Sequence, residues 1–152
     1  MKYQFELNEQ EEQPVLSIRT RTAVENLPKV IGEAYGKIMG YMAQLGEHPA
    51  GVPYTAYYNM DMQDLDVEMG FPVAKARPGQ GDVQAGAIPA GRYVTCMYKG
   101  PYSQMEEPYN EITKWMAEKG YEPLGVSYEY YYNSPEEVPE SELLTKIAIA
   151  IK

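Results

Sequence analysis

Apolar residues recur at steps of three or four along two stretches of the chain, and this spacing predicts two amphipathic helices. The first series ends at Gly46 and the second at Gly120, and glycine is a typical residue at a helix C-terminus. Pro108 is expected in the first turn of the second helix. The apolar positions are Leu27, Ile31, Ala34, Ile38, Met42 and Leu45 in the first series, and Met105, Tyr109, Ile112 and Met116 in the second.

Segments rich in β-branched and aromatic residues flank both predicted helices and are typical of β-strands. One such segment precedes each helix and two follow it, so each half of the chain reads strand, helix, strand, strand. The segments are residues 14–22, 52–59 and 65–73 in the first half, and 91–100, 126–133 and 142–151 in the second. Residues 3–8 and 82–90 are each expected to add a strand to the front of their own half.

The two halves are copies of one unit. Residues 34–59 align without gaps on residues 108–133 at a constant offset of 74, and 12 of the 26 positions are identical. We therefore predict an α+β fold in which two pseudo-symmetric β-α-β-β repeats, about 1–76 and about 82–152, form one domain over residues 1–152. A ligand cleft is expected between the repeats.

The alternation of side chains along a strand gives the segment SYEYYYN (127–133) two distinct faces. Glu129 and Tyr131 share one face, whereas Tyr128 and Tyr130 share the other, which we expect to pack on the helices. The repeat equates Glu129 with Thr55 of the first copy, so the fold itself does not require the acid. Glu129 is either a solvated strand residue or the polar anchor of a ligand site.

The equivalent face of the first copy carries Tyr57, which corresponds to Tyr131. On the last strand of each copy, the residues expected on the same side as Glu129 are Glu68 and Gly70 in the first copy, and Lys146 and Ala148 in the second. Lys146 is therefore a candidate ion-pair partner of Glu129.

The composition favours a small-molecule site over other kinds of site. The chain has 15 Tyr and 9 Met against 2 Phe, which suits an amphipathic cavity. Its formal net charge of −9, without a basic cluster, disfavours direct binding to nucleic acid. The only histidine, His48, and the only cysteine, Cys96, lie far apart in the chain, so we expect no metal and no cofactor.

The single cysteine also excludes an internal disulfide framework and indicates a reducing compartment, and Cys96 is expected to pack as a small hydrophobe. No signal peptide is evident, and no apolar run approaches the ~20 residues of a membrane helix. We expect a cytoplasmic protein without membrane association.

An ordered set of motifs resembles the GyrI-like small-molecule-binding domain family. The motifs are VEMGFPV, IPAGRYVTCMYKGPY, PYNEITKWMAEKGYEPLG, YEYYYNSP and ELLTKIAIAI, and they cover nearly the whole chain. The resemblance implies two pseudo-symmetric modules with a hydrophobic ligand cleft. It also implies that the glutamate of the E-x-Y strand, here Glu129 with Tyr131, meets the positive charge of lipophilic cations. The chain departs from the family where TKIA replaces the usual T-E-I-Y, so Lys146 and Ala148 stand at positions of an acid and an aromatic residue.

Three functions follow from this resemblance. The first is a stand-alone binding protein for amphipathic, aromatic or cationic small molecules, since the chain begins with the first strand and leaves no residues for a DNA-binding domain. The second is a hydrolase that opens cyclopropane groups of DNA-alkylating natural products, with Glu129 activating water. Tyr57, Tyr98, Tyr131 and Trp115 would then form walls or supply an acid, although core packing explains Trp115 about as well. The third is inhibition of a protein partner such as gyrase.

Overall fold

The computed structural model describes residues 3–152, and these divide into two compact units. Unit 1 combines the residues up to Gln10 with Gly91–Lys152, and unit 2 comprises Glu11–Ala90. Each unit contains one long helix and four strands, so the expected α+β class is confirmed. No helix in the described part of the chain is both long enough and apolar enough to span a membrane.

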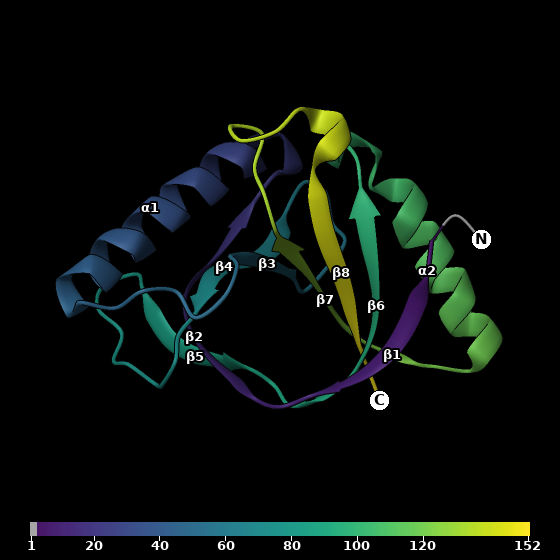
Figure 1. The fold of residues 1–152 in the computed structure, drawn as a ribbon, viewed down its shortest axis with the longest axis horizontal. Coiled ribbons are helices and arrows are strands. Elements are labelled where there is room, and N and C mark those ends of the chain that lie inside the picture. The colour runs from purple at the N-terminus through teal and green to yellow at the C-terminus, as the bar shows by residue number, and fades with distance from the viewer. Residues whose placement is uncertain (1–2) are drawn as a thin grey trace. The chain divides into compact units, whose positions relative to one another are not determined.

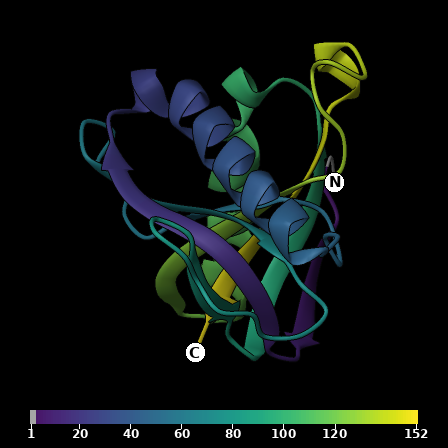
Figure 2. The ribbon, with the colours of Figure 1, turned by 90° about the vertical axis from the view of Figure 1, so that its left-hand side faces the viewer.

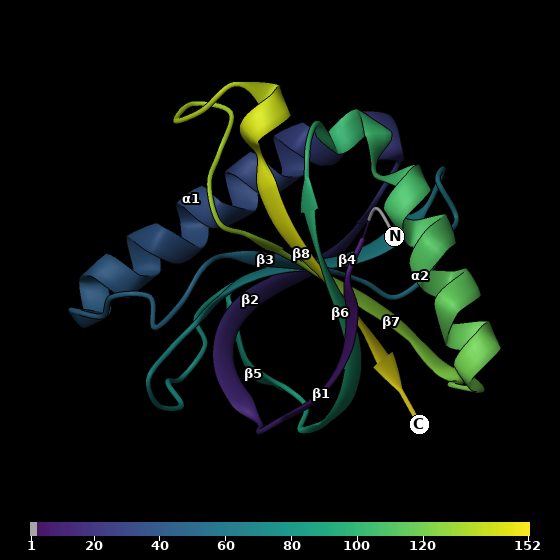
Figure 3. The ribbon, with the colours of Figure 1, turned by 45° about the vertical axis from the view of Figure 1, so that its right-hand side comes forward.

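Unit 1 is an antiparallel sheet with strand order β1-β6-β8-β7 and one long helix, α2 (Figures 1 and 3). Its core lies between α2 and one face of the sheet, and includes Cys96, Ile112 and Ile147. The short 3-10 helices η2 (Tyr102–Gln104) and η3 (Glu140–Glu142) precede α2 and β8. The other elements are β1 (Phe5–Gln10), β6 (Gly91–Lys99), α2 (Glu106–Lys119), β7 (Pro123–Tyr131) and β8 (Leu144–Ile151).

Unit 2 has the same composition, with strand order β3-β4-β2-β5 and the helix α1. Figure 2 shows α1 running along β2, and the core between them includes Leu16, Ile38 and Met69. A 3-10 helix, η1 (Val24–Asn26), leads into α1. The remaining elements are β2 (Gln13–Thr22), α1 (Leu27–Leu45), β3 (Tyr54–Tyr57), β4 (Leu65–Pro72) and β5 (Gln84–Ile88).

Both helices end where the sequence indicates. Gly46 follows α1 and Gly120 follows α2, and both have left-handed backbone conformations, with φ of 69° and 76°. Their backbone N–H groups donate to Ala43 and Ala117, which satisfies carbonyl groups that the helix end would leave unpaired. The predicted apolar faces of both helices face the cores of their units.

The two additional strands pair differently from the prediction. β1 lies at the start of the chain but pairs with β6 of unit 1, and β5 pairs with β2 of unit 2. Each additional strand therefore joins the sheet of the other copy. Hydrophobic alternation identifies a strand but not its partner, because any exposed edge offers the same backbone hydrogen-bonding groups.

Equivalent residues of the two copies make the same local contacts. The Asn59 side chain accepts a hydrogen bond from Asp66 N and donates to Asp64 O, both at 3.0 Å. Asn133 likewise accepts from Leu144 N at 2.9 Å and donates to Glu142 O at 3.1 Å. Asn59 thus closes the loop before β4, and Asn133 closes the equivalent loop before β8. The pseudo-symmetric arrangement of the whole chain, and the cleft expected between the repeats, stay predictions.

Candidate functional site

Glu129 is a buried carboxylate held by tyrosine hydroxyl groups in unit 1. It lies on β7, and its side chain is on the face that packs against α2, with only 7% of the residue exposed. Tyr109 of α2 donates a hydrogen bond to Oε2 at 2.5 Å, and Tyr131 donates to Oε1 at 3.0 Å. Each carboxylate oxygen therefore has a phenol donor.

Burial raises the pKa of Glu129, because removal from water disfavours the charged form. The hydrogen bonds from Tyr109 and Tyr131 act in the opposite direction, since they stabilise the carboxylate. No basic side chain contributes to this balance, and within residues 3–152 none forms an ion pair with Glu129. Among the described residues, the site is thus a carboxyl group with aromatic surroundings and no cationic partner.

Two further residues complete the surroundings of Glu129. The Tyr102 ring packs edge-on against Tyr131 with 5.7 Å between the ring centroids, and 40% of Tyr102 is exposed. Burial, followed by the negative charge of Glu129, raises the pKa of Tyr102. Thr145 of β8 lies directly opposite Tyr131 and is fully buried, and its hydroxyl has no hydrogen-bond partner among the described residues.

The predicted orientation of β7 is wrong. Glu129 lies opposite Ile147 and is reached by Tyr109, so Glu129 and Tyr131 are on the helix face. Tyr128 lies on the other face, where its ring packs edge-on against Tyr93, with 6.0 Å between the centroids. Both faces of β7 are packed, so the alternation of apolar residues did not identify the one that contacts the helix.

This orientation separates Lys146 and Ala148 from Glu129. In the register of β7 and β8, Lys146 lies opposite Tyr130 and Ala148 opposite Tyr128, so both are on the face away from α2. The Lys146 ammonium group lies 5.4 Å from the centre of the Tyr130 ring. The sequence makes Lys146 a candidate ion-pair partner of Glu129. The structure places the two side chains on opposite faces of the sheet, so this expectation is wrong.

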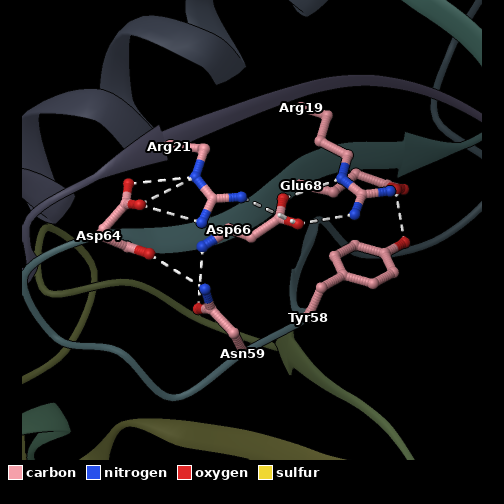
Figure 4. Close-up of polar contacts among 7 residues, drawn as sticks. All are labelled: Arg19, Arg21, Tyr58, Asn59, Asp64, Asp66 and Glu68. Atoms are coloured by element: carbon pink, nitrogen blue, oxygen red, sulfur yellow. Dashed lines mark hydrogen bonds and ion pairs between the residues drawn. The ribbon is translucent and has the colours of Figure 1, made fainter.

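Unit 2 contains a second carboxylate with two tyrosine partners, Glu68 of β4. Tyr54 donates a hydrogen bond to Oε2, and Tyr58 donates to Oε1 at 2.8 Å. The Arg19 guanidinium group lies over the Tyr58 ring, 3.8 Å from its centre, and also forms a two-point ion pair with Asp66 (Figure 4). Arg19 therefore brings a positive charge beside this tyrosine-carboxylate group, although its ion pair is with Asp66.

The other tyrosines and the tryptophan predicted at the site pack in the cores of the two units. Tyr57 packs against the core of unit 2 on the α1 side, where neighbouring Thr55 lies 3.2 Å from the Tyr35 hydroxyl. Tyr98 is buried and donates to Pro101 O at 2.7 Å, and its Cα partner on β8 is Thr145. Trp115 packs against Phe5, with 5.6 Å between the ring centroids, which supports a core role.

Cys96 packs in the unit 1 core as predicted, and its burial raises the pKa of the thiol to about 11. No group of three or more His, Cys, Asp or Glu side chains within residues 3–152 is arranged to hold a metal ion.

Tyr109, Tyr102 and Thr145 were not predicted as site residues. A signal existed for Tyr109, because it is identical to Tyr35 under the repeat and both hydroxyl groups contact the equivalent strand position, Glu129 or Thr55. For Tyr102 and Thr145 the sequence carried no such signal, since Thr145 is placed by strand register and Tyr102 by the path of the η2 segment. Chemically, the arrangement can accept a cation at Glu129 or use its carboxylate as a base.

Solved structures of several proteins resemble this chain. The regulator EcmrR shares 23% identity in a complex with DNA, at a TM-score of 0.84, over 99% of this chain and 57% of that chain. Its separate C-terminal domain also shares 23% identity, at a TM-score of 0.77, and the alignment covers 100% of this chain and 99% of that domain. This chain thus spans little more than half of the EcmrR chain in the DNA complex.

Two more distant structures have the same fold. A hydrolase from Listeria innocua is 12% identical at a TM-score of 0.71, with 98% of this chain and 92% of that chain covered. SAV2435, in complex with tetraphenylphosphonium, is 10% identical at a TM-score of 0.69, with 100% and 94% covered. No curated protein sequence matches the chain. The GyrI-like small molecule binding domain matches residues 3–152, and the chain belongs to this family.

Proposed function

We propose that this chain binds amphipathic, aromatic or cationic small molecules, and that Glu129 is the polar anchor for the positive charge. The observation that carries the proposal is the contrast between Glu129 and Glu68. Both carboxylates accept hydrogen bonds from two tyrosines, but Arg19 lies over the Tyr58 ring beside Glu68, whereas Glu129 has no basic partner within the described residues. A ligand cation would supply the charge that Arg19 supplies in unit 2.

Aromatic rings around a carboxylate favour this ligand class. A cation over an aromatic face gains about 0.5–2 kcal/mol, more when water is excluded, and an adjacent carboxylate adds Coulomb attraction at low dielectric. Tyr109, Tyr131 and Tyr102 provide such rings. The relative SAV2435, whose structure contains tetraphenylphosphonium, supports a lipophilic cation as the first probe.

Because Glu129 is buried, a ligand can reach it only if residues that cover it move. Glu129 is 7% exposed, whereas the Tyr102 ring above Tyr131 is 40% exposed and belongs to the short η2 segment. A three-residue 3-10 helix has few hydrogen bonds to break. We therefore expect η2, rather than the strands, to yield when a ligand reaches Glu129.

The test is a titration of a fluorescent lipophilic cation into the wild type and Glu129→Gln. Loss of a charge-assisted interaction costs about 1.5–3 kcal/mol, so the affinity of the variant should fall roughly 10- to 100-fold. Glu68→Gln is the matched control, since it removes the same charge from a carboxylate that also has two tyrosine donors. The dye affinity of Glu68→Gln should stay within about twofold of the wild type.

Equal dye affinity in the wild type and Glu129→Gln would refute the anchor role. An equal loss in both variants would instead show that the dye responds to the net charge of −9 and not to a particular site.

A second candidate function is hydrolysis of cyclopropane-bearing electrophiles at the same carboxylate, as the family resemblance implies. The observation in its favour is that burial raises the pKa of Glu129, which makes the carboxylate a better base for activating water. Tyr131 would orient that base, and Tyr57 is the other tyrosine proposed for catalysis. The similar fold of the Listeria innocua hydrolase is consistent with this candidate.

The hydrolysis test is to incubate a strained cyclopropane substrate with the wild type and Glu129→Gln, and to follow water addition by mass spectrometry. Water addition that depends on Glu129 would establish an enzyme. Tight binding of the substrate without turnover would rule out hydrolysis of this substrate and support only the binding function.

A further inference from the structure

The Thr145 hydroxyl group is the one buried side-chain polar group that lacks a hydrogen-bond partner within residues 3–152. Thr145 is fully buried, so water does not reach its Oγ1 from the surface. Buried polar groups in folded proteins are almost always paired, and an unpaired one calls for an explanation. The other fully buried threonine, Thr55, differs in this respect, because its Oγ1 lies 3.2 Å from the Tyr35 hydroxyl.

Thr145 lies beside Glu129 on the same face of the unit 1 sheet. It is directly opposite Tyr131, and Glu129 is opposite Ile147, so Thr145 and Glu129 are diagonal neighbours on adjacent strands. Such neighbours are about 7–8 Å apart, a spacing that one polar ligand group can bridge. Tyr131, which donates to Glu129, lies between them in the register.

Glu129 and Thr145 differ in whether their oxygen atoms accept hydrogen bonds. Both Glu129 oxygens already accept a hydroxyl hydrogen, whereas the Thr145 oxygen can accept a hydrogen bond and accepts none. A quaternary cation would satisfy the charge of Glu129 but has no hydrogen to donate. A protonated amine would satisfy the charge and also donate an N–H hydrogen bond to Thr145.

We propose that Thr145 makes the Glu129 site selective for protonated amines, which carry an N–H group, over quaternary cations of the same shape. This inference rests on the proposed function, because it assumes that cations bind at Glu129. It adds a specificity determinant, Thr145, and a narrower ligand class. The pairing of a ligand N–H with Thr145 Oγ1 would regain the cost of burying that oxygen without a partner.

The experiment compares N,N-dimethyl-1-(2-naphthyl)methanamine, which is protonated near neutral pH, with its N,N,N-trimethyl quaternary counterpart. We expect the wild type to bind the protonated amine about tenfold more tightly, as one charged hydrogen bond allows. Thr145→Val should lose this preference while keeping its affinity for the quaternary cation. Thr145→Ser, which retains a hydroxyl group, should keep the preference.

Two controls separate this inference from the proposed function. Thr95→Val removes a buried hydroxyl from unit 1, at a threonine that already accepts a hydrogen bond from Asn8 at 2.7 Å, and should leave the preference unchanged. Glu129→Gln should weaken the binding of both cations. The quaternary cation therefore tests the anchor alone, and the ratio of the two affinities tests Thr145.

Several results would overturn the inference. Equal affinities of the wild type for the two cations would do so while leaving the Glu129 anchor intact, as would an unchanged preference in Thr145→Val. Failure of both cations to bind would overturn the proposed function as well. A lower urea midpoint for Thr145→Val would show that the hydroxyl has a partner in the free protein, which contradicts the premise.

Discussion

Glu129 and Glu68 share the same local chemistry but differ in their charged neighbours. Each carboxylate has two tyrosine donors, so burial of the charge is partly compensated in both places. Arg19 adds a positive charge near Glu68, and its ion pair with Asp66 raises the pKa of Arg19, so that its charge is permanent. Glu129 has no such neighbour between residues 3 and 152, and its protonation is therefore expected to depend on pH and on a bound cation.

The raised pKa of Glu129 predicts a pH-dependent contribution to stability. The folded state holds the proton more tightly than the unfolded state, whose pKa is near the ordinary 4.5. The contribution of Glu129 is therefore fully favourable below that pH, and is lost as the pH rises through the folded-state pKa. Within that window the loss approaches about 1.4 kcal/mol for each pH unit.

The measurement is urea unfolding of the wild type and Glu129→Gln at a series of pH values from 4 upward. The difference in free energy of unfolding, wild type minus variant, should decrease as the pH rises and then level off. A difference that increases with pH would show that the folded state lowers the pKa of Glu129.

The helix α1 contains three glycines that packing does not require. Gly32, Gly36 and Gly40 are spaced four residues apart, and a Cβ atom added at any of them would have no heavy atom within 4 Å apart from its chain neighbours and the nearby helix backbone. Gly70 of β4 is the opposite case, because an added Cβ would lie 2.7 Å from the Tyr54 hydroxyl oxygen and 2.8 Å from Leu16 O. The glycine in β4 is required by packing, whereas those in α1 are not.

This contrast predicts opposite effects of the same substitution. Gly36→Ala should stabilise the protein by about 0.5–1 kcal/mol, because alanine loses less backbone entropy in a helix. Gly70→Ala should destabilise it by about 1–3 kcal/mol, because Tyr54 and the backbone of β2 would have to move. Thermal or urea unfolding of both variants measures the effects, and a neutral Gly70→Ala would show that the Tyr54 ring is free to shift.

The sequence predicted the elements well but not the facing of β7. Apolar spacing located α1 and α2, and Gly46 and Gly120 marked their ends. For β7 the alternation predicts that Tyr128 faces the helices, but the helix-facing residue is Glu129, whose carboxylate accepts a hydrogen bond from Tyr109 of α2. A hydrogen bond between distant residues cannot be predicted from alternation, because it depends on where α2 docks on the sheet.

At the scale of the whole molecule, the repeat explains why the site is asymmetric. Tyr35 and Tyr109 are equivalent, and each contacts the equivalent position of its strand, but that position is Thr55 in one copy and Glu129 in the other. The shared scaffold supplies the tyrosine, and a single difference supplies the charge. This difference is the sequence observation on which the proposed role of Glu129 is based.

The sequence did not show which sheet each additional strand joins. β1 and β5 pair across the copies, with β6 and β2, so each compact unit contains a segment from the opposite half of the chain. Pairing of a strand with the opposite half of the chain leaves no signal in the local pattern of apolar and polar residues. Apolar spacing located the helices, but the pairing of these two strands required the structure.

We propose that Glu129 selects for positive charge, and two ions of equal shape but opposite charge provide the sharpest test. Tetraphenylphosphonium and tetraphenylborate have nearly the same size and opposite charges, and their affinities can be measured by calorimetry. The wild type should prefer the cation, and Glu129→Gln should reduce the ratio of the two affinities by about tenfold or more, whereas Glu68→Gln should leave it nearly unchanged. An unchanged ratio in Glu129→Gln would contradict the claim, since charge selection would then come from elsewhere in the molecule.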